Sequence, residues 1–271
     1  ASVVKELIEN ALDAGAKTIG VDIEGAGRAL IRVADDGVGI PAADVELAFA
    51  RHATSKITAA SDLFSVSTLG FRGEALAAIG SVSRTGMVTR AAGEPDGTQI
   101  KMEGGAVVSR GLIGAPQVTV VSVENLFFNV PARLKFLKSE VSERGHILNL
   151  VTRYALAYPA IRFKLNVDNR AVFQSSGNGD LREALTAVYG IEIAKQLIEI
   201  APASDAGPPP FEPEPDTDDE WPRVVRERPP ASITVSGFIS PPALNRSNRK
   251  EITIFVNGRC VLDIRLSAAV M

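Results

Sequence analysis

The first residues of the chain carry an apolar stripe and a polar stripe on opposite sides of one predicted helix. The apolar stripe consists of Val3, Leu7, Ala11 and Ala14. This spacing, followed by Gly15 as a stop signal, predicts an amphipathic helix over residues 2–14. On the other face, Glu6, Asn10 and Asp13 stand at positions i, i+4 and i+7. Solvated helices commonly carry such a stripe, so at this point a functional site and a plain surface are equally good interpretations.

The rest of the sequence alternates β-rich runs with helical patterns. Two β-rich runs, at 18–24 and 29–34, flank the turn at 25–27 and predict a hairpin. Further strands are predicted at 81–90, 98–103, 118–123, 161–167, 171–174, 196–200, 232–239 and 252–256. Helices are predicted at 42–51, from about residue 74, at 140–157 and at 181–188. Residues 52–73 lose any regular period and predict a long loop, and loops of that length are usually functional or disordered.

The length and charge of the chain limit its organisation. Its 271 residues indicate two domains, which we expect at 1–193 and, as a partial second domain, at 194–271. The stretch 201–231 is rich in proline and acidic residues and is expected to be a disordered insertion. The net charge of -3 gives no overall attraction to nucleic acid, so any such binding depends on local basic patches.

Cysteine content and apolar runs indicate the compartment. Cys260 is the only cysteine in the sequence, which excludes an internal disulfide and a multi-cysteine metal site and fits a reducing compartment. No apolar run reaches about 18 residues and no signal peptide begins the sequence, so we predict a cytoplasmic protein without membrane contact. The chain starts and ends within helical patterns, and we therefore expect it to be truncated at both ends.

Two glycine-containing motifs have the composition of ligand sites. Asp35 ends the second predicted strand and is followed by Gly37 and Gly39, so a carboxylate can accept a hydrogen bond where the backbone can approach a flat ligand. Residues 70–75 lie where a loop becomes a helix, and the free N–H groups of a helix start favour phosphate. Lys56, in the same loop, is a further candidate for phosphate. Taken singly these motifs are weak, because Asp-Gly pairs usually mark ordinary turns.

The order of these motifs is more specific than any one of them. A helix with Glu and Asn, then Asp-x-Gly-x-Gly, then a glycine loop running into a helix resembles the ATPase superfamily of gyrase, heat-shock chaperones, histidine kinases and MutL proteins. The Walker motif Gly-x4-Gly-Lys-Ser/Thr does not occur in the sequence. Four longer strings resemble MutL-type DNA mismatch repair proteins and disfavour the gyrase and chaperone branches; they are residues 1–16, 51–56, 70–76 and 125–136.

The resemblance covers most of residues 1–193 and, more loosely, 232–266. It implies an α+β fold, with a two-layer α/β sandwich ATP-binding domain of the Bergerat type followed by a smaller α/β domain like the second domain of ribosomal protein S5. The implied cofactors are ATP and Mg²⁺.

The same resemblance implies roles for individual residues. The glutamate matching Glu6 is the general base that activates the attacking water, and the asparagine matching Asn10 holds Mg²⁺ through its amide oxygen. The aspartate matching Asp35 recognises the adenine amine. The other implied nucleotide-binding positions are Gly37, Gly39, Thr54, Ser55, Lys56, Gly70, Phe71, Arg72, Gly73, Glu74, Ala75 and Thr119.

The resemblance further implies a switch that couples ATP-driven closure and dimerisation to DNA binding and partner recruitment. The implied partners are DNA, bound without regard to sequence, a mismatch-recognition protein and downstream repair enzymes. The candidate DNA contacts are Arg133, Lys135, Lys138, Arg246, Arg249, Lys250, Arg259 and Arg265. Exposed basic residues are also commonly only solubilising, since contact with phosphate needs positive charge in the right place. We expect an ATP-dependent homodimer for the intact protein and a monomer for this fragment.

Two departures from the family pattern leave an alternative open. Val118 stands where the family usually has a glycine before the threonine, and the family's N-terminal arm and distal lysine have no counterpart in the sequence. The alternative is a nucleotide-inactive DNA- or partner-binding module of the same family. We expect Asp13 to cap or orient its helix, and His52 and His146 to be structural.

Overall fold

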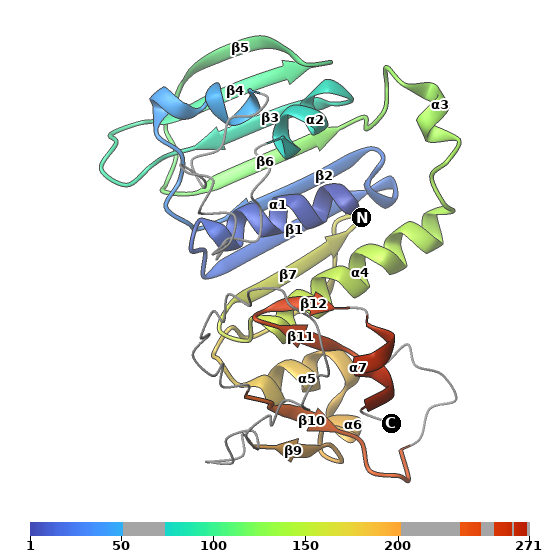
Figure 1. Ribbon diagram of the computed structural model, residues 1–271. Helices are drawn as coiled ribbons and strands as arrows, with labels where there is room; N and C mark the ends of the chain where they lie inside the picture. Colours follow the sequence, from blue (N-terminus) through green and yellow to red (C-terminus); the bar gives the residue numbers. More distant parts are fainter. Residues whose placement is uncertain (51–73, 202–233, 245–251, 262, 270–271) are drawn as a thin grey trace, which may run out of the picture.

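The computed structural model describes residues 1–50, 74–201, 234–244, 252–261 and 263–269 (Figure 1). Within these ranges the dominant element is a sheet of eight strands. Across the sheet the strands are β5 (Ala106–Ile113), β4 (Gly97–Glu103), β3 (Arg84–Thr89), β6 (Thr119–Glu124), β2 (Leu30–Asp35), β1 (Thr18–Glu24), β7 (Arg162–Val167) and β8 (Arg170–Gln174). Neighbouring strands are antiparallel except for β1 and β7, which run parallel.

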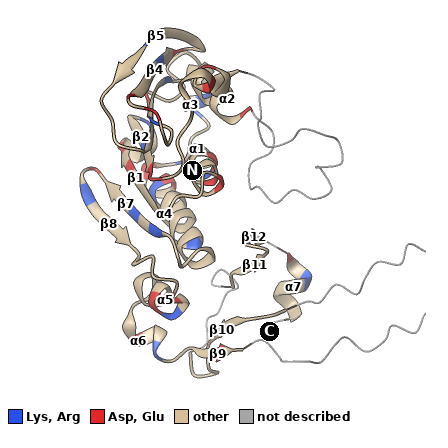
Figure 2. Cartoon of the chain, turned by 90° about the vertical axis from the view of Figure 1, so that its left-hand side faces the viewer, with Lys and Arg blue, Asp and Glu red and all other residues tan. Residues whose placement is uncertain are grey.

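Helices pack on one face of this sheet. They are α1 (Ser2–Asp13), α2 (Ala75–Ser81) and α4 (Glu140–Ala157), which contact β1 and β2, β3 and β4, and β7, respectively. Figure 2 shows α1 and α4 on the same side of the strands. Alternate residues of each central strand are buried beneath the helices, as a half-covered antiparallel sheet requires. The largest of them are Ile19, Ile23, Ile31, Met87, Ile100, Phe163 and Leu165.

Smaller elements follow the sheet along the chain. They are α5 (Leu181–Tyr189), α6 (Ile191–Ala194), β9 (Ile198–Ile200), β10 (Gly237–Ile239), β11 (Ile254–Val256), β12 (Arg259–Val261) and α7 (Ile264–Ala269). Phe238 and Phe255 pack on a separate small core around Leu185. Arg182 connects α5 to α6 and β10. Its guanidinium donates to the carbonyls of Ala194 and Leu197 and lies 4.6 Å from the ring centre of Phe238.

The mixed helical and β class expected from the sequence is confirmed, and so is the hairpin around 25–27, which holds the short 3-10 turn η1 (Gly25–Gly27). The helix predicted at 42–51 is wrong over residues 42–50, the part that the structure describes. Two 3-10 turns, η2 (Ala42–Asp44) and η3 (Leu47–Phe49), occupy its place. The predicted helix rested on a helical spacing, and Val45 and Phe49 are indeed buried four residues apart, but Ala50 is extended and ends the second turn.

Two other differences concern strands. The strand predicted at 81–90 begins only at Arg84, because Ser81 still belongs to α2. β5 was not predicted, since almost all of its residues are exposed and the alternation that marks a half-buried strand is missing. Of the strand predicted at 232–239, residues 234–239 are described, and only β10 is a strand. No helix in the described ranges is long and apolar enough to cross a membrane.

Candidate active site

Helix α1 presents Glu6 and Asn10 one turn apart at the surface of the helical layer. Val4, Leu7, Ile8 and Ala11 bury the opposite side of the helix against the sheet. Glu6 and Asn10 are half-exposed, and the Glu6 side chain keeps 42% of its accessible surface. The helix therefore holds one carboxylate and one amide close together on a rigid support.

The chain after β2 is fastened to the end of α1. The N–H of Val38 donates to the carbonyl of Ala14 at 3.0 Å, and the N–H of Gly37 donates to Oδ1 of Asp35 at 3.0 Å. A Cβ at position 37 would stand 2.8 Å from the carbonyl oxygen of Ala14. Only glycine allows this close approach, which sets the buried Asp35 carboxylate beside the C-terminal end of α1.

Asp35 and Asp36 are adjacent in sequence but have different environments. Oδ1 of Asp36 accepts the N–H groups of Lys17 and Thr18 at 2.7 and 2.8 Å, at the start of β1. Burial alone would raise the pKa of Asp36, but these hydrogen bonds outweigh it and hold the pKa below its ordinary value. Asp36 therefore binds the backbone where β1 begins, beside the end of β2. Of the two carboxylates, Asp35 is the one that remains available to a ligand.

Asp35 begins a polar row that crosses the buried face of the sheet. In the strand register Asp35 pairs with Thr119, Thr119 with Thr89, and Thr89 with Thr98. All four residues are buried. The hydroxyl of Thr89 lies 3.0 Å from that of Thr119 and accepts the N–H of Ile40 at 3.0 Å. The Thr98 hydroxyl has no hydrogen-bond partner within the described ranges.

Asp35 and Thr119 are among the site residues predicted from the sequence, whereas Thr89 is not. The signal that reveals Thr89 is its position in the strand register, which places it next to Thr119, and a single sequence does not show which strands pair. Four buried polar side chains in one row would be costly in an apolar core, so this end of the sheet has the composition of a polar site.

Burial raises the pKa of Asp35 from its ordinary 3.8 to about 6; the charge of Asp36 adds to the shift and the Gly37 N–H opposes it. Between about pH 4 and pH 6 the folded protein therefore keeps a proton on Asp35 that the unfolded chain releases. The stability that protonated Asp35 contributes is present below about pH 4 and is lost as the pH rises through about 6. We expect Asp35→Asn to have a higher melting temperature than wild type at pH 7.5, and the difference between the two melting temperatures to be smaller at pH 4.5. A difference that is independent of pH in thermal melts would contradict the shifted pKa.

Gly39 predicts a second effect on stability. Its φ is +76°, and a Cβ would stand 2.2 Å from the backbone oxygen of Arg90. We expect Gly39→Ala to lower the free energy of unfolding by at least about 1–3 kcal/mol, the cost of a strained backbone position. Gly86→Ala is the matched control, because a Cβ there meets nothing within 4 Å. Equal denaturation midpoints for the two variants would contradict this expectation and would show that the backbone around Gly39 can rearrange to accept a Cβ.

A buried carboxylate on α1 was also missed. Glu9 is buried, and its two carboxylate oxygens accept from Nζ of Lys5 at 2.7 Å and from the hydroxyl of Tyr154 on α4 at 2.8 Å. Burial, followed by the hydrogen bond to Glu9 and then by its charge, raises the pKa of Tyr154. Lys5 lies 3.7 Å from Glu6 as well. Glu9 thus fastens α1 to α4 and is not available to a ligand, whereas Glu6 is.

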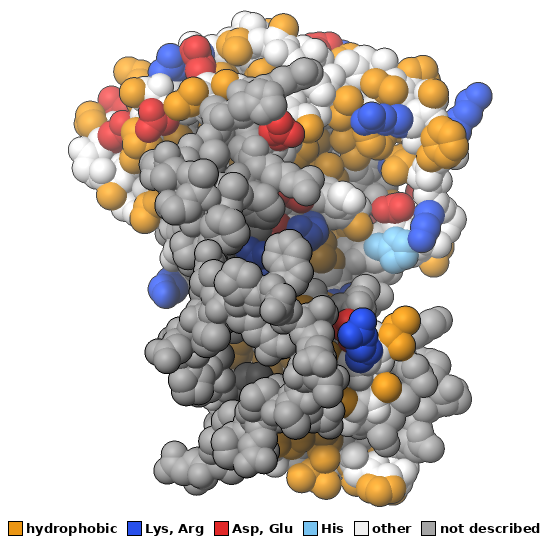
Figure 3. All heavy atoms as spheres, viewed as in Figure 1, with side chains coloured by type: hydrophobic (Ala, Val, Ile, Leu, Met, Phe, Trp, Pro, Cys, Tyr) orange, Lys and Arg blue, Asp and Glu red, His pale blue; other side chains and the backbone are white. Residues whose placement is uncertain are grey.

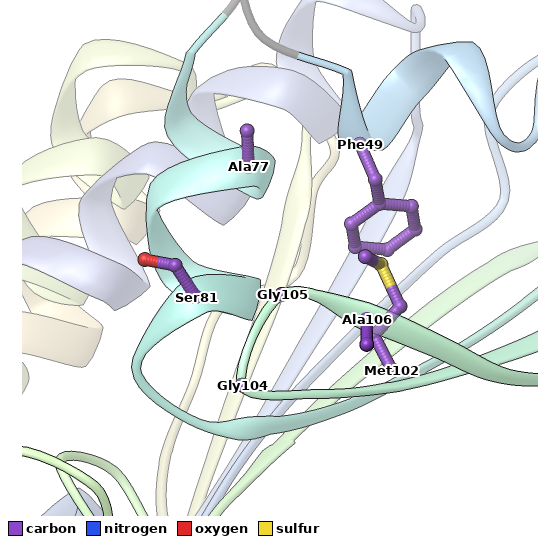
Figure 4. A pocket seen from close by; sticks show the side chains of 7 residues that line it. All are labelled: Phe49, Ala77, Ser81, Met102, Gly104, Gly105 and Ala106. Atoms are coloured by element: carbon purple, nitrogen blue, oxygen red, sulfur yellow. The ribbon is translucent and has the colours of Figure 1, made fainter.

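Several predicted phosphate contacts lie outside the described residues: Thr54, Ser55, Lys56, Gly70, Phe71, Arg72 and Gly73, together with His52. Glu74 and Ala75 are described at the start of α2. A cavity of about 500 Å³ lies beside α2, and its lining includes Ala77 and Ser81 of that helix together with Phe49 and Met102, which lie next to each other (Figure 4). No predicted site residue lines this cavity, and its side chains carry no charge, so it does not compete with the Asp35 row as the site of chemistry.

The candidate DNA contacts fall into separate places. Arg133 lies on α3 (Pro131–Leu134), and its guanidinium carbon is 5.8 Å from the ring centre of Phe127. Lys135 and Lys138 follow on the same exposed segment. Arg259 and Arg265 are exposed on β12 and α7. Arg246, Arg249 and Lys250 lie outside the described residues. His146 is exposed on α4.

Comparison with known proteins adds to this geometry. Residues 1–124 match the family model of histidine kinase-, DNA gyrase B- and HSP90-like ATPases, and residues 215–271 match that of the DNA mismatch repair protein C-terminal domain. The chain is 45% identical to the DNA mismatch repair protein MutL of Streptococcus mutans over 271 residues, all of this chain and 38% of that protein. The chain belongs to the MutL family of DNA mismatch repair proteins. The MutL of Desulforudis audaxviator is also 45% identical, over 99% of this chain and 43% of the length of that protein.

Solved MutL structures share the fold. The Aquifex aeolicus MutL ATPase domain complexed with ADP superposes with a TM-score of 0.68 at 29% identity, covering 98% of this chain and 84% of that one. A second structure of the Aquifex aeolicus MutL ATPase domain gives a TM-score of 0.64 at 30% identity, covering 98% and 80%. The chain spans about two fifths of the length of the curated MutL relatives it matches.

Proposed function

We propose that the chain is the ATP-binding and ATP-hydrolysing part of a DNA mismatch repair switch. The observation that carries the proposal is that two buried residues, Asp35 and Thr119, are cross-strand neighbours. They lie beside a helix that presents Glu6 and Asn10. The ADP bound by the Aquifex aeolicus MutL ATPase domain supports nucleotide as the ligand. We also propose that the ATP-binding domain is 1–193 and that 194–271 belongs to a second, DNA-contacting domain.

The residue types fit the proposed ligands. The Asp35 carboxylate accepts the adenine amine, and Gly37 and Gly39 let the backbone approach the base. The Asn10 amide oxygen is a hard ligand of the kind that Mg²⁺ takes beside waters and phosphate oxygens. When bound, Mg²⁺ neutralises phosphate charge. Glu6, half-exposed one turn from Asn10, accepts a proton from the attacking water.

The remaining positions complete the proposal. The phosphates are contacted by Thr54, Ser55, Lys56, Gly70, Phe71, Arg72, Gly73, Glu74 and Ala75. ATP brings two protomers of the whole protein together, while residues 1–271 on their own are a monomer. The partners are a mismatch-recognition protein and downstream repair enzymes.

Basic side chains supply the proposed grip on DNA. Figure 3 shows basic and hydrophobic side chains together over α3, where Arg133, Lys135 and Lys138 lie in an exposed segment. The further basic positions proposed are Arg246, Arg249, Lys250, Arg259 and Arg265. Contacts of this kind go to phosphate and carry no base recognition, so binding is independent of DNA sequence and weakens with salt.

Calorimetry with a non-hydrolysable ATP analogue and Mg²⁺ tests the nucleotide half of the proposal. We expect a heat of binding for one analogue per chain. The absence of any heat would favour the alternative, a nucleotide-inactive DNA- or partner-binding module. Val118 is one of the two departures that motivated that alternative, and its carbonyl accepts the N–H of Arg90 at 3.1 Å, which extends the pairing of β3 with β6. The strand conformation at this position does not require glycine.

A further inference from the structure

Thr89 is a fully buried threonine, with 0% of its surface exposed, beside the proposed adenine position. Its hydroxyl oxygen accepts the backbone N–H of Ile40 at 3.0 Å and lies 3.0 Å from the hydroxyl of Thr119. The two threonines are cross-strand partners on β3 and β6, and Thr119 is in turn the partner of Asp35 on β2. Thr89 thus connects the backbone around Gly39 to one of the proposed base-reading groups.

The direction of the Thr89–Thr119 hydrogen bond follows from counting protons. A threonine hydroxyl has one proton to donate and two lone pairs that accept. Within the described ranges, Thr119 is the only acceptor found for the Thr89 proton. If Thr119 donated instead, the Thr89 proton would be buried without a partner, which costs roughly 1–3 kcal/mol. Thr89 therefore donates to Thr119.

The Thr119 proton is then left for a ligand. Thr119 and Asp35 each keep 8% of their surface exposed, at the open side of the row, whereas Thr89 is closed off. Oδ1 of Asp35 already accepts the N–H of Gly37, so its second oxygen remains as an acceptor for a ligand. The site offers one donor next to one acceptor. Adenine shows the matching pattern, because its 6-amino group donates beside a ring nitrogen that accepts, whereas a 6-oxo purine presents an acceptor at position 6.

We infer that Thr89 is a specificity-determining positioning residue, which fixes the Thr119 hydroxyl as a donor and so makes the site select a 6-amino over a 6-oxo purine nucleotide. The inference rests on the proposed function, because it assumes that the base lies at Asp35 and Thr119. Thr89 itself touches no nucleotide and acts through Thr119.

The test compares non-hydrolysable triphosphates of adenosine and inosine, which differ at position 6 and in the protonation of the neighbouring ring nitrogen. Affinities for both are measured by calorimetry with Mg²⁺ on wild type, Thr89→Val and Thr89→Ser. We expect wild type and Thr89→Ser to prefer the adenosine analogue alike. In Thr89→Val the Thr119 hydroxyl can turn, and we expect the preference to fall by about tenfold, the effect of one lost hydrogen bond, while Asp35 maintains the remainder.

Thr98→Val is the matched control. Thr98 is the next buried threonine in the row, on β4, and its hydroxyl has no partner within the described ranges. Its replacement should leave the preference for adenosine unchanged, and melting curves of all variants check that each is folded. An unchanged preference in Thr89→Val, or an equal fall in Thr98→Val, would overturn the inference. Failure of wild type to bind either triphosphate would instead contradict the proposed function.

Discussion

Replacement of Glu6 by alanine is expected to remove ATP turnover by the intact protein while leaving nucleotide binding in place. Glu6 is half-exposed on α1, and its only ion pair within the described ranges is a 3.7 Å contact with Lys5. Lys5 keeps its shorter bond to Glu9, so the helix should not be disturbed. Loss of a general base typically costs about 10²–10⁴-fold in rate. Steady-state phosphate release and calorimetry on the same preparation measure the two properties.

Glu124→Ala provides a control for this variant. Glu124 is an exposed carboxylate at the end of β6, at the other end of the strand from Thr119, and its removal should change neither turnover nor binding. Normal turnover in the Glu6 variant would exclude Glu6 as the base. Loss of binding together with turnover would mean that Glu6 holds the nucleotide or the helix.

Asp35→Asn is expected to weaken the affinity for an ATP analogue by about tenfold to a hundredfold, as loss of a hydrogen bond to a charged group does. The Gly37 N–H donates to Oδ1 of Asp35, so an asparagine would keep its oxygen there and turn its NH₂ group toward the base. The NH₂ group of the asparagine and the adenine amine, which are both donors, would then face each other. The same substitution removes the cost of burying a charge, so the nucleotide-free protein should become more stable at neutral pH.

Asp36→Asn should behave in the opposite way. Its carboxylate accepts two N–H groups at the start of β1, and hydrogen bonding holds its pKa low, so its neutral form should destabilise the fold. ATP affinity should remain within about threefold of wild type, a difference of less than about 0.7 kcal/mol. Equal losses of affinity in the two variants, measured by calorimetry, would show that the loop and not the Asp35 carboxylate recognises the base.

The sequence was most informative where periodicity and motif order coincide. The α1 stripe and the strand that ends in Asp35 were both found, because an amphipathic helix and a half-buried strand each leave a regular pattern. Residues 42–51 were misread for a related reason, since buried residues at helical spacing also arise in two successive 3-10 turns. β5 left no pattern because both of its faces are exposed.

The sequence could not reveal contacts that depend on strand order. Thr89 and Thr119 are 30 positions apart, and only the pairing of β3 with β6 makes them neighbours. Glu9 belongs to the same helix as Glu6, but its burial depends on Tyr154, 145 positions away on α4. Which of two similar carboxylates is free to act is therefore decided by packing, and a helical stripe alone does not decide it.

The most direct measurement of the central claim is a crystal structure of the chain with a non-hydrolysable ATP analogue and Mg²⁺. We expect the adenine amine to lie within hydrogen-bond distance of Asp35, the Asn10 amide oxygen to bind Mg²⁺, and Glu6 to lie within reach of a water in line with the terminal phosphate. An analogue bound elsewhere, or bound with its base away from Asp35 and Thr119, would contradict it.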